Sequence, residues 1–317
     1  MATPNAPVKP RTGLVDARAA PSYIANKRSF TMEVLMKLGT ARTPSGTRAV
    51  LQNAGGTRLL EFPTVGAALA AGALSDRAAL PGTPVEDPAA LDLGSAVTGQ
   101  GKVICVGHNF RSHILEMGHG LPEHPNVFSK FPEALIGARD DIQLDAASAA
   151  WDWEAELAVV IGTPIRGATR ETAGRAIAGY TVANDVTARD WQRRASQWLV
   201  GKTFESTTPL GPWIVTTDEA DPATGLAIVC SVDGVQKQKS STSDLLFGPA
   251  ELVAYLSQVI TLRPGDVILT GTPAGVGAAR TPPEGLSPGN TLVTAIEGIG
   301  ECRNRCVSFT SLPTYTA

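Results

Sequence analysis

The chain has few cysteines and aromatic residues, and neither sign of charge predominates. With 43% hydrophobic residues the chain can form a proper core, which excludes a small disulfide scaffold, and its four cysteines include no C-x-x-C pair and are expected to be buried free thiols. A net charge of −3 without a basic cluster predicts no nucleic-acid partner. The longest apolar runs, such as 157–162, fall far short of the roughly 18 residues that span a membrane, and residues 1–28 lack the apolar core of a signal peptide. We therefore expect a cytoplasmic protein without a membrane partner.

Glycine and proline, by contrast, are abundant. The chain has 32 glycines and 23 prolines, which indicates many turns and favours strands over a helical bundle. From residue 103 onward, short apolar strand candidates follow one another with turn residues between them: 103–106, 127–129, 153–161, 180–186, 213–216, 227–232, 267–270 and 292–296. Helices are expected only at 169–177 and 249–258 in this part. The pattern predicts a mostly β, α+β fold built on a rolled sheet of about 200 residues.

The first hundred residues have a weaker pattern and no recognisable chemistry. They predict short strands at 30–38, 48–51 and 58–62, helical pieces at 65–71 and 76–79, and a proline-rich linker at 81–92. We divide the chain into four parts: a flexible N-terminal arm (1–28), a small α+β domain with its linker (29–98), a catalytic domain (99–309) and a tail (310–317).

Two carboxylates stand at the entrance of the most apolar strand candidate. Glu154 and Glu156 are at positions i and i+2, so in a strand they face the same side with Cα atoms roughly 7 Å apart. Carboxylates that share a site beside a core need a cation to stay ionised. All-oxygen ligands suit Mg²⁺, Mn²⁺ or Ca²⁺ rather than Zn²⁺. The alternative is an edge strand with an acidic solvent face.

A second apolar strand candidate ends in an acidic residue. In the run 179–190, Asp185 follows the strand and offers a third oxygen ligand. The pair Asn184-Asp185 also suits a turn or a helix N-cap, which is the structural alternative. We interpret Arg189 and Asp190 as a structural ion pair.

A histidine and a glutamate follow the strand expected at 103–106. His113 and Glu116 are three residues apart and share one face of a helical turn. A carboxylate beside an imidazole orients the ring and raises its basicity, which produces a general base able to activate water; a structural histidine is the alternative. The other histidines have no acid at such spacing and are interpreted as structural: His108, His119 and His124.

Two polar loops complete the candidate site. Lys202, within G-K-T-F-E, is available to neutralise an oxyanion or a substrate carboxylate, unless it is a solvated surface lysine. The glycine-rich segment 270–277 lacks the Lys-Ser/Thr of a phosphate-binding loop, so no nucleotide site is expected there. Its backbone N–H groups and Thr272 are instead expected to bind an anionic substrate.

Seven segments between residues 103 and 307, taken in order, resemble the fumarylacetoacetate hydrolase (FAH) family. They are G-H-N-F-R-S-H-x-x-E, F-S-K, D-W-E-A-E-L-A-V-V-I-G, N-D-V-T-A-R-D-W-Q, G-K-T-F-E-S, P-L-G-P-W and P-G-D-V-I-L-T-G-T-P-A-G-V-G. The resemblance implies a mixed β-roll of the FAH type and a homodimer. It also implies Mg²⁺ or Mn²⁺ as cofactor, with Ca²⁺ able to replace it in crystals, and a small keto acid as substrate.

The resemblance assigns roles to the residues singled out above. The three carboxylates match the family's metal ligands, the His113–Glu116 pair matches a water-activating dyad on a short lid helix, and Lys202 matches a lysine that contacts the metal-bound substrate. Further positions match substrate-binding residues: Gln192, Thr272, Lys130 and Asn109. Three positions depart from the family pattern: Phe110 where Tyr is common, Glu205 where Asp is usual, and His108 at a variable position that could face the pocket.

These roles imply a divalent-metal-dependent hydrolase of a C–C bond in a small 1,3-diketo acid of the acylpyruvate, fumarylpyruvate or fumarylacetoacetate type. The dyad would activate water, and the leaving group would be an enolate stabilised by the metal. The same site would also suit a decarboxylase or isomerase of a 2-keto or 2-hydroxymuconate-type acid. A non-catalytic ligand-binding relative is the third interpretation, and it would be expected to have lost a metal carboxylate or Lys202.

Overall fold

A computed structural model of the chain describes residues 36–72, 80–98 and 101–310. The arm expected at 1–28, the helix expected at 76–79 and the tail from residue 311 lie outside these ranges. Within them, strands predominate over helices and form mixed sheets, as the glycine and proline content predicts. The expected mostly β, α+β fold is confirmed.

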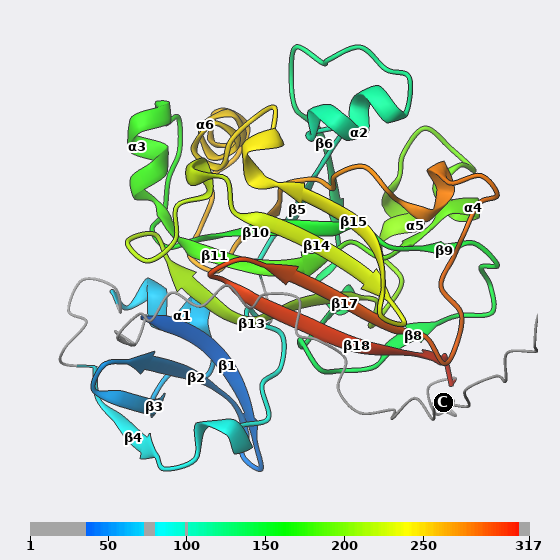
Figure 1. The fold of residues 1–317 in the computed structure, drawn as a ribbon. Helices are drawn as coiled ribbons and strands as arrows, with labels where there is room; N and C mark the ends of the chain where they lie inside the picture. Colours follow the sequence, from blue (N-terminus) through cyan, green and yellow to red (C-terminus); the bar gives the residue numbers. More distant parts are fainter. Residues whose placement is uncertain (1–35, 73–79, 99–100, 311–317) are drawn as a thin grey trace, which may run out of the picture. The chain divides into compact units, whose positions relative to one another are not determined.

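The largest sheet joins the N-terminal strands of the described chain with strands from its middle and from residues 267–269 (Figure 1). Its strands follow one another in the order β4 (Gly82–Val85), β3 (Gly56–Leu60), β2 (Gly46–Asn53), β1 (Lys37–Thr43), β13 (Thr208–Thr216), β11 (Ile177–Asn184), β10 (Ala155–Ile161), β16 (Val267–Leu269), β5 (Val103–Gly107) and β6 (Asn126–Lys130), with β7 (Leu135–Ile136) beside β13. Neighbours are antiparallel except β16–β5 and β13–β7. Every residue of β10 and β11 is buried, so these two strands are covered on both faces.

A second sheet packs on one face of β10, β11 and β13. It consists of β15 (Val235–Ser241), β14 (Ala227–Val232), β17 (Thr291–Ile296), β18 (Gly300–Ser308) and β8 (Ile142–Leu144). Burial alternates along β14 and β17, because one face of this sheet packs on the core and the other meets solvent. Alternate residues of β10 serve two cores: Leu157 and Val159 pack toward the second sheet, whereas Ala158 and Val160 pack on the opposite side.

The helices are short and lie around the sheets. They are α1 (Val65–Ala70), α2 (Arg111–Glu116), α3 (Arg170–Arg175), α4 (Arg189–Gln192), α5 (Leu199–Lys202) and α6 (Pro249–Val259), with 3₁₀ turns at Pro88–Ala90, Pro132–Ala134, Pro222–Thr224, Thr242–Asp244 and Gly277–Ala279. The helical piece expected at 65–71 is α1, and the two helices expected after residue 103 are α3, which Thr169 caps, and α6, which begins with Pro249. These two pack together, whereas α2 stands at the top of Figure 1, between β5 and β6. A two-residue pair, β9 (Trp151–Asp152) with β12 (Thr187–Ala188), lies beside the site described below.

The N-terminal strands continue the large sheet. β1 pairs with β13 through Lys37↔Val215 and Leu38↔Ile214. The sheet therefore crosses the boundary that we place between residues 98 and 99, and the boundary itself stays a prediction. The expected linker 81–92 contains a strand. Residues 82–85 form β4, whose backbone pairs with β3, so this part of the linker belongs to the sheet.

Apolar strands were predictable, and polar ones were not. The strands expected at 103–106, 127–129, 227–232, 267–270 and 292–296 agree with β5, β6, β14, β16 and β17 within one residue at each end. β15 and β18 have no such signal, because V-Q-K-Q-K-S-S and G-E-C-R-N-R-C-V-S bury mainly a glutamine, an asparagine and two cysteines. Their strand conformation depends on neighbouring strands that the local sequence does not reveal.

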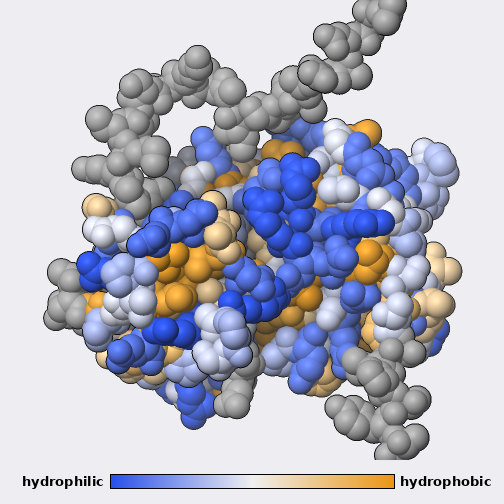
Figure 2. Space-filling view, turned by 90° about the horizontal axis from the view of Figure 1, so that it is seen from below, coloured by the Kyte–Doolittle hydropathy of each residue, from blue (hydrophilic) through white to orange (hydrophobic). Residues whose placement is uncertain are grey.

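In the face shown in Figure 2, hydrophobic residues appear in several separate areas between hydrophilic ones. Among the described residues, no helix has both the length and the apolar character that crossing a membrane requires.

Candidate active site

The register of β10 and β11 brings two acidic residues together. Ala155 pairs with Asn184, so Glu154, which precedes β10, lies beside Asp185, which follows β11. The Asp185 N–H donates to the Glu154 carbonyl oxygen at 2.8 Å, and the Glu154 N–H donates to Asn184 Oδ1 at 3.0 Å. Backbone hydrogen bonding therefore fixes both residues at one end of the central strands.

Glu156 completes a group of three carboxylates. Ligand oxygens of Glu154, Glu156 and Asp185 all lie within 4.8 Å of one another. All three residues are buried, with 6% exposure at most. The structure thus brings together the three predicted metal ligands, and it excludes the alternative of an edge strand with an acidic solvent face, because β10 is a central strand.

Two buried lysines neutralise part of this charge. Lys202, at the end of α5, donates from Nζ to Glu154 Oε2 at 2.7 Å and to Asp185 Oδ2 at 2.9 Å. Lys130, at the end of β6, donates from Nζ to Asp185 Oδ1 at 2.5 Å. Lys202 is therefore not a solvated surface lysine; it is 2% exposed and lies at the carboxylates.

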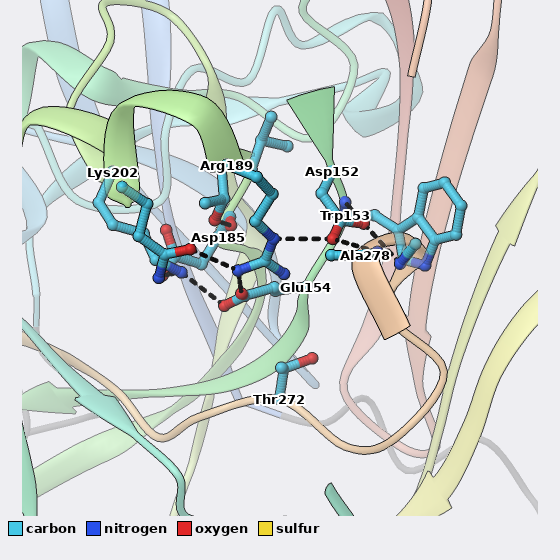
Figure 3. A network of polar contacts seen from close by, with 12 residues as sticks. Asp152, Trp153, Glu154, Asp185, Arg189, Lys202, Thr272 and Ala278 are labelled. Atoms are coloured by element: carbon cyan, nitrogen blue, oxygen red, sulfur yellow. Dashed lines mark hydrogen bonds and ion pairs between the residues drawn. The ribbon is translucent and has the colours of Figure 1, made fainter. Parts of the chain in front are cut away.

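Arg189 neutralises the remaining charge near Glu154. Its guanidinium contacts Asp152 Oδ2 at 2.8 Å and Glu154 Oε1 at 2.7 Å, so that Glu154 lies between Lys202 and Arg189 in Figure 3. The expected ion pair between Arg189 and Asp190 is wrong: Asp190 instead accepts from the Ser148 hydroxyl at 2.6 Å. Burial explains the choice, because a buried guanidinium needs a buried carboxylate as its partner.

Glu154 and Lys202 are held in their charged forms. Burial alone would raise the pKa of Glu154, but attraction to Lys202 and Arg189 outweighs it and the pKa is lowered. Burial alone would lower the pKa of Lys202, but Asp185 and Glu154 outweigh it and the pKa is raised.

Glu156 differs from the other two carboxylates, because among the described residues no cation forms an ion pair with it. Its Oε2 accepts one hydrogen bond, from the Gly271 N–H at 2.7 Å. Burial, together with repulsion from Asp185 and Glu154, raises the pKa of Glu156 well above its usual range. A divalent cation would relieve this repulsion, and the all-oxygen donor set suits a hard ion such as Mg²⁺ or Mn²⁺. The three carboxylates therefore fit a divalent metal.

The predicted dyad forms on α2. His113 Nδ1 and Glu116 Oε2 are 3.0 Å apart, and His113 is largely buried with 8% exposure. Glu116 also accepts from the Gly275 N–H at 3.1 Å, which ties α2 to the glycine-rich segment. The carboxylate thus orients the imidazole and anchors the helix at the same time.

Contacts with a distant loop position the other end of α2. The helix has no N-cap hydrogen bond of its own. Instead, the Ser112 N–H donates to Asp244 Oδ2 at 3.0 Å, the Ser112 hydroxyl donates to the same oxygen at 2.5 Å, and Arg111 donates to the Leu245 carbonyl at 2.5 Å. Residues far away in the sequence therefore replace the missing cap.

The glycine-rich segment 270–277 binds carboxylates of the protein itself. Its backbone N–H groups donate to Glu156 from Gly271, to Glu116 from Gly275 and to Asp152 from Gly277. The expectation that these N–H groups bind substrate is therefore wrong for these three residues, because they already donate to carboxylates of the protein itself.

A cavity of about 340 Å³ lies over these groups. Its lining includes the dyad histidine, two of the carboxylates and Lys202, with an apolar part from Val106, Met117, Phe128, Trp198 and Val276. The cavity therefore combines charged and polar side chains with apolar ones, as small-molecule sites usually do.

The predicted substrate-binding residues fall into two groups. Gln192 and Thr272 line the cavity. Asn109 does not: it is fully buried, and its side chain bonds the Phe247 and Thr270 backbone. Lys130 is also absent from the lining, because its ammonium lies behind Asp185 as a charge partner.

The three departures from the family pattern have different outcomes. Phe110 is fully buried in the core and Glu205 is exposed, and neither lines the cavity. His108 does line it, as its variable position suggested.

Sequence reasoning missed Asp152 and Gln238. Asp152 accepts from Arg189 and from the N–H groups of Gly277 and Ala278. Gln238 accepts from the Ala155 N–H at 2.9 Å and donates to Thr272 Oγ1 at 2.8 Å. Asp152 belongs to the D-W-E-A-E motif and could have been singled out with it, whereas Gln238 lies in a polar strand without a motif.

Comparison with known proteins agrees with this geometry. Residues 102–307 match the family described as fumarylacetoacetate (FAA) hydrolase C-terminal. A Bos taurus protein named oxaloacetate tautomerase FAHD2A, mitochondrial, is 46% identical over 213 residues, which cover 67% of this chain and 68% of the relative.

Solved structures of the same family are similar. The fumarylacetoacetate hydrolase of Exiguobacterium antarcticum has a TM-score of 0.77 and 32% identity, with 86% of this chain and 100% of that chain covered. The 5-carboxymethyl-2-hydroxymuconate delta-isomerase of Mycobacterium smegmatis has a TM-score of 0.70 and 37% identity, with 87% and 100% covered. The chain belongs to the fumarylacetoacetate hydrolase family of enzymes.

Proposed function

We propose that this site transfers a proton at the carbon next to the keto group of a small 2-oxo acid, as a keto–enol tautomerase or isomerase that uses Mg²⁺ or Mn²⁺. One observation carries the proposal: His113, oriented by Glu116, lines the same cavity as Glu154, Glu156 and Lys202. A general base and groups that stabilise negative charge on oxygen are what enolisation requires. The names of the bovine and mycobacterial relatives support this reaction class.

His113 would act as the base. Because Nδ1 contacts the Glu116 carboxylate, the proton lies on Nδ1 and the Nε2 lone pair remains available. Glu116 stabilises the imidazolium that forms when Nε2 takes a proton from carbon.

The other side of the cavity would stabilise the enolate oxygen. Glu154, Glu156 and Asp185 would hold the divalent ion, which when bound supplies Lewis-acid stabilisation of negative charge on the substrate oxygens. The ammonium of Lys202 is buried beside Glu154 and Asp185, and these two carboxylates raise its pKa, so that it stays charged. The Gln192 amide, whose oxygen accepts from Arg189 at 3.0 Å, has an NH₂ group left to donate to substrate.

Hydrolysis of a C–C bond in a 1,3-diketo acid is the second candidate. The observation that favours it is the dyad itself, because an imidazole paired with a carboxylate can deprotonate water as well as carbon. The Exiguobacterium structure carries the hydrolase name. A small keto acid as substrate is common to both candidates, and a homodimeric assembly stays a prediction.

Measuring absorbance at the enol and diketo bands would distinguish the tautomerase from the C–C bond hydrolase. The enol form of oxaloacetate and a short acylpyruvate would be offered to the protein with Mg²⁺, with Mn²⁺ and with chelator. We expect metal-dependent loss of the oxaloacetate enol without loss of carbon–carbon bonds. Release of pyruvate from the acylpyruvate would favour the hydrolase instead, and His113→Ala and Glu156→Gln should abolish either activity. Turnover that persists in chelator would contradict the proposal.

A further inference from the structure

The cavity contains more basic groups than its acidic residues use. Lys202 and Arg189 are matched by Glu154, Asp152 and Asp185. The lining also includes His108, His119 and Arg193, and among the described residues none of these three forms an ion pair with a carboxylate. Groups that can donate to an anion are therefore left over in this cavity.

Two of these side chains lie together. The ring centroids of His108 and His119 are 5.0 Å apart, and the His108 ring meets the edge of Trp198 at 5.4 Å. A Cβ atom at Gly107 would lie 2.4 Å from the Trp198 ring, so the absence of a side chain there lets the indole pack directly on the backbone. The tryptophan thus packs on both the Gly107 backbone and the His108 ring.

The backbone at His108 is also unusual. His108 has a φ of 54°, which side chains other than glycine seldom adopt, and it follows directly on β5. Such conformations are found where the surrounding structure requires a particular side-chain position, often at ligand sites. In this protein the result is an imidazole at the cavity instead of a residue that continues the strand.

We infer that His108 and His119 form a subsite for a second carboxylate of the substrate, so that the enzyme prefers 2-oxo dicarboxylic acids to 2-oxo monocarboxylic acids. The inference rests on the proposed function, because it places the 2-oxo end at Lys202 and the three carboxylates. A carboxylate has two oxygens that can accept from two imidazole N–H groups. Its charge would also relieve the mutual repulsion that helps to lower the pKa of His108 in the protein without ligand.

The remaining basic groups of the cavity are less suited to this role. His113 is engaged by Glu116 and is assigned to proton transfer. Arg193 also lines a second, neighbouring cavity of about 250 Å³, which includes Glu284 as a possible partner for its guanidinium. The paired imidazoles are therefore the better site for the second carboxylate.

Binding of a matched pair of 2-oxo acids tests the subsite without activity. 2-Oxoglutarate and 2-oxopentanoate have the same number of carbons and differ only in a terminal carboxylate or methyl group. Isothermal titration calorimetry at saturating Mg²⁺ would give both Kd values for wild type, His108→Asn, His119→Asn and the double variant. His124→Asn is the matched control, because His124 is exposed, stacks on Tyr255 and does not line the cavity.

We expect wild type and His124→Asn to bind 2-oxoglutarate at least about tenfold more tightly than 2-oxopentanoate, as for a hydrogen-bonded charged group. The double variant should bring this ratio close to one while changing the Kd of 2-oxopentanoate less than about threefold. An unchanged ratio in the double variant, or no preference in wild type, would overturn the subsite and leave the proposed function standing. Failure of wild type to bind either 2-oxo acid would contradict the proposed function, and the subsite with it.

Discussion

The two sides of the cavity are built in different ways. The carboxylate side belongs to β10 and β11, two central strands whose residues are all buried and which are hydrogen-bonded on both edges. The base side belongs to α2, a helix of six residues without an N-cap of its own. An isolated helix of this length is not stable in water, so contacts made by Ser112 and Glu116 with distant segments determine its position.

This difference assigns separate tasks to the two sides. The strands hold like charges close together, which demands a rigid frame and buried cations such as Lys202. The helix holds one base that has to approach the substrate, and a few surface hydrogen bonds suffice for that. Stability should therefore depend on the carboxylate side, and turnover should respond to changes on either side.

The largest effect is expected from Asp185→Asn. The change leaves the ammonium groups of Lys130 and Lys202 buried with one carboxylate fewer, which should lower the free energy of unfolding by about 3–5 kcal/mol. Urea unfolding measures this change in the free energy of unfolding. Glu156→Gln is the matched variant: no cation loses a partner, so stability without metal should stay the same or rise, while stabilisation by Mg²⁺ disappears. Equal destabilisation by both changes would contradict the assignment of charges.

His113→Ala should affect turnover and little else. Loss of a positioned general base typically lowers the rate by about 10²–10⁴-fold. Because His113 contacts no carboxylate of the metal group, the Kd of Mg²⁺ measured by calorimetry should be unchanged. The turnover rate of Glu116→Gln should lie between the rates of His113→Ala and wild type. A loss of Mg²⁺ affinity in His113→Ala would show that the two sides are not separate.

The same contrast explains what the sequence could predict. The apolar runs that form β10 and β11 identify a buried frame, and acidic residues at their ends identify Glu154, Glu156 and Asp185. The His113–Glu116 pair is local and was also predictable. The partners of these residues were not, because Arg189, Asp152 and Gln238 meet the site through tertiary packing and have no fixed spacing from it. The Arg189–Asp190 pair illustrates the error, since adjacent opposite charges need not bind each other.

A smaller effect is expected from Asp244→Ala. It removes the carboxylate that accepts from Ser112 at the start of α2, and loss of a cap costs a helix about 1 kcal/mol. We expect kcat to fall about five- to tenfold through displacement of His113, with Mg²⁺ affinity unchanged. Asp244→Asn, which keeps an acceptor oxygen, should restore most of the rate. Full activity in the alanine variant would show that Arg111 and Glu116 alone position the helix.

The smallest effect concerns the dependence of stability on pH. Burial and the neighbouring His119 and His113 lower the pKa of His108 from its ordinary value of 6.5. The folded state therefore binds this proton less tightly than the unfolded chain, and the free energy of unfolding falls as the pH drops below 6.5. His108→Asn should flatten this decline in thermal unfolding between pH 5 and pH 7. A steeper decline in the variant would contradict the assigned direction.

The most direct test of the central claim is deuterium incorporation at C3 of oxaloacetate, followed by proton NMR in D₂O. The account predicts exchange well above the background rate with Mg²⁺, and a return to background in chelator, in His113→Ala and in Glu156→Gln. Exchange at the background rate in wild type with Mg²⁺, or full exchange in folded His113→Ala, would contradict the claim that this cavity abstracts a proton from a 2-oxo acid.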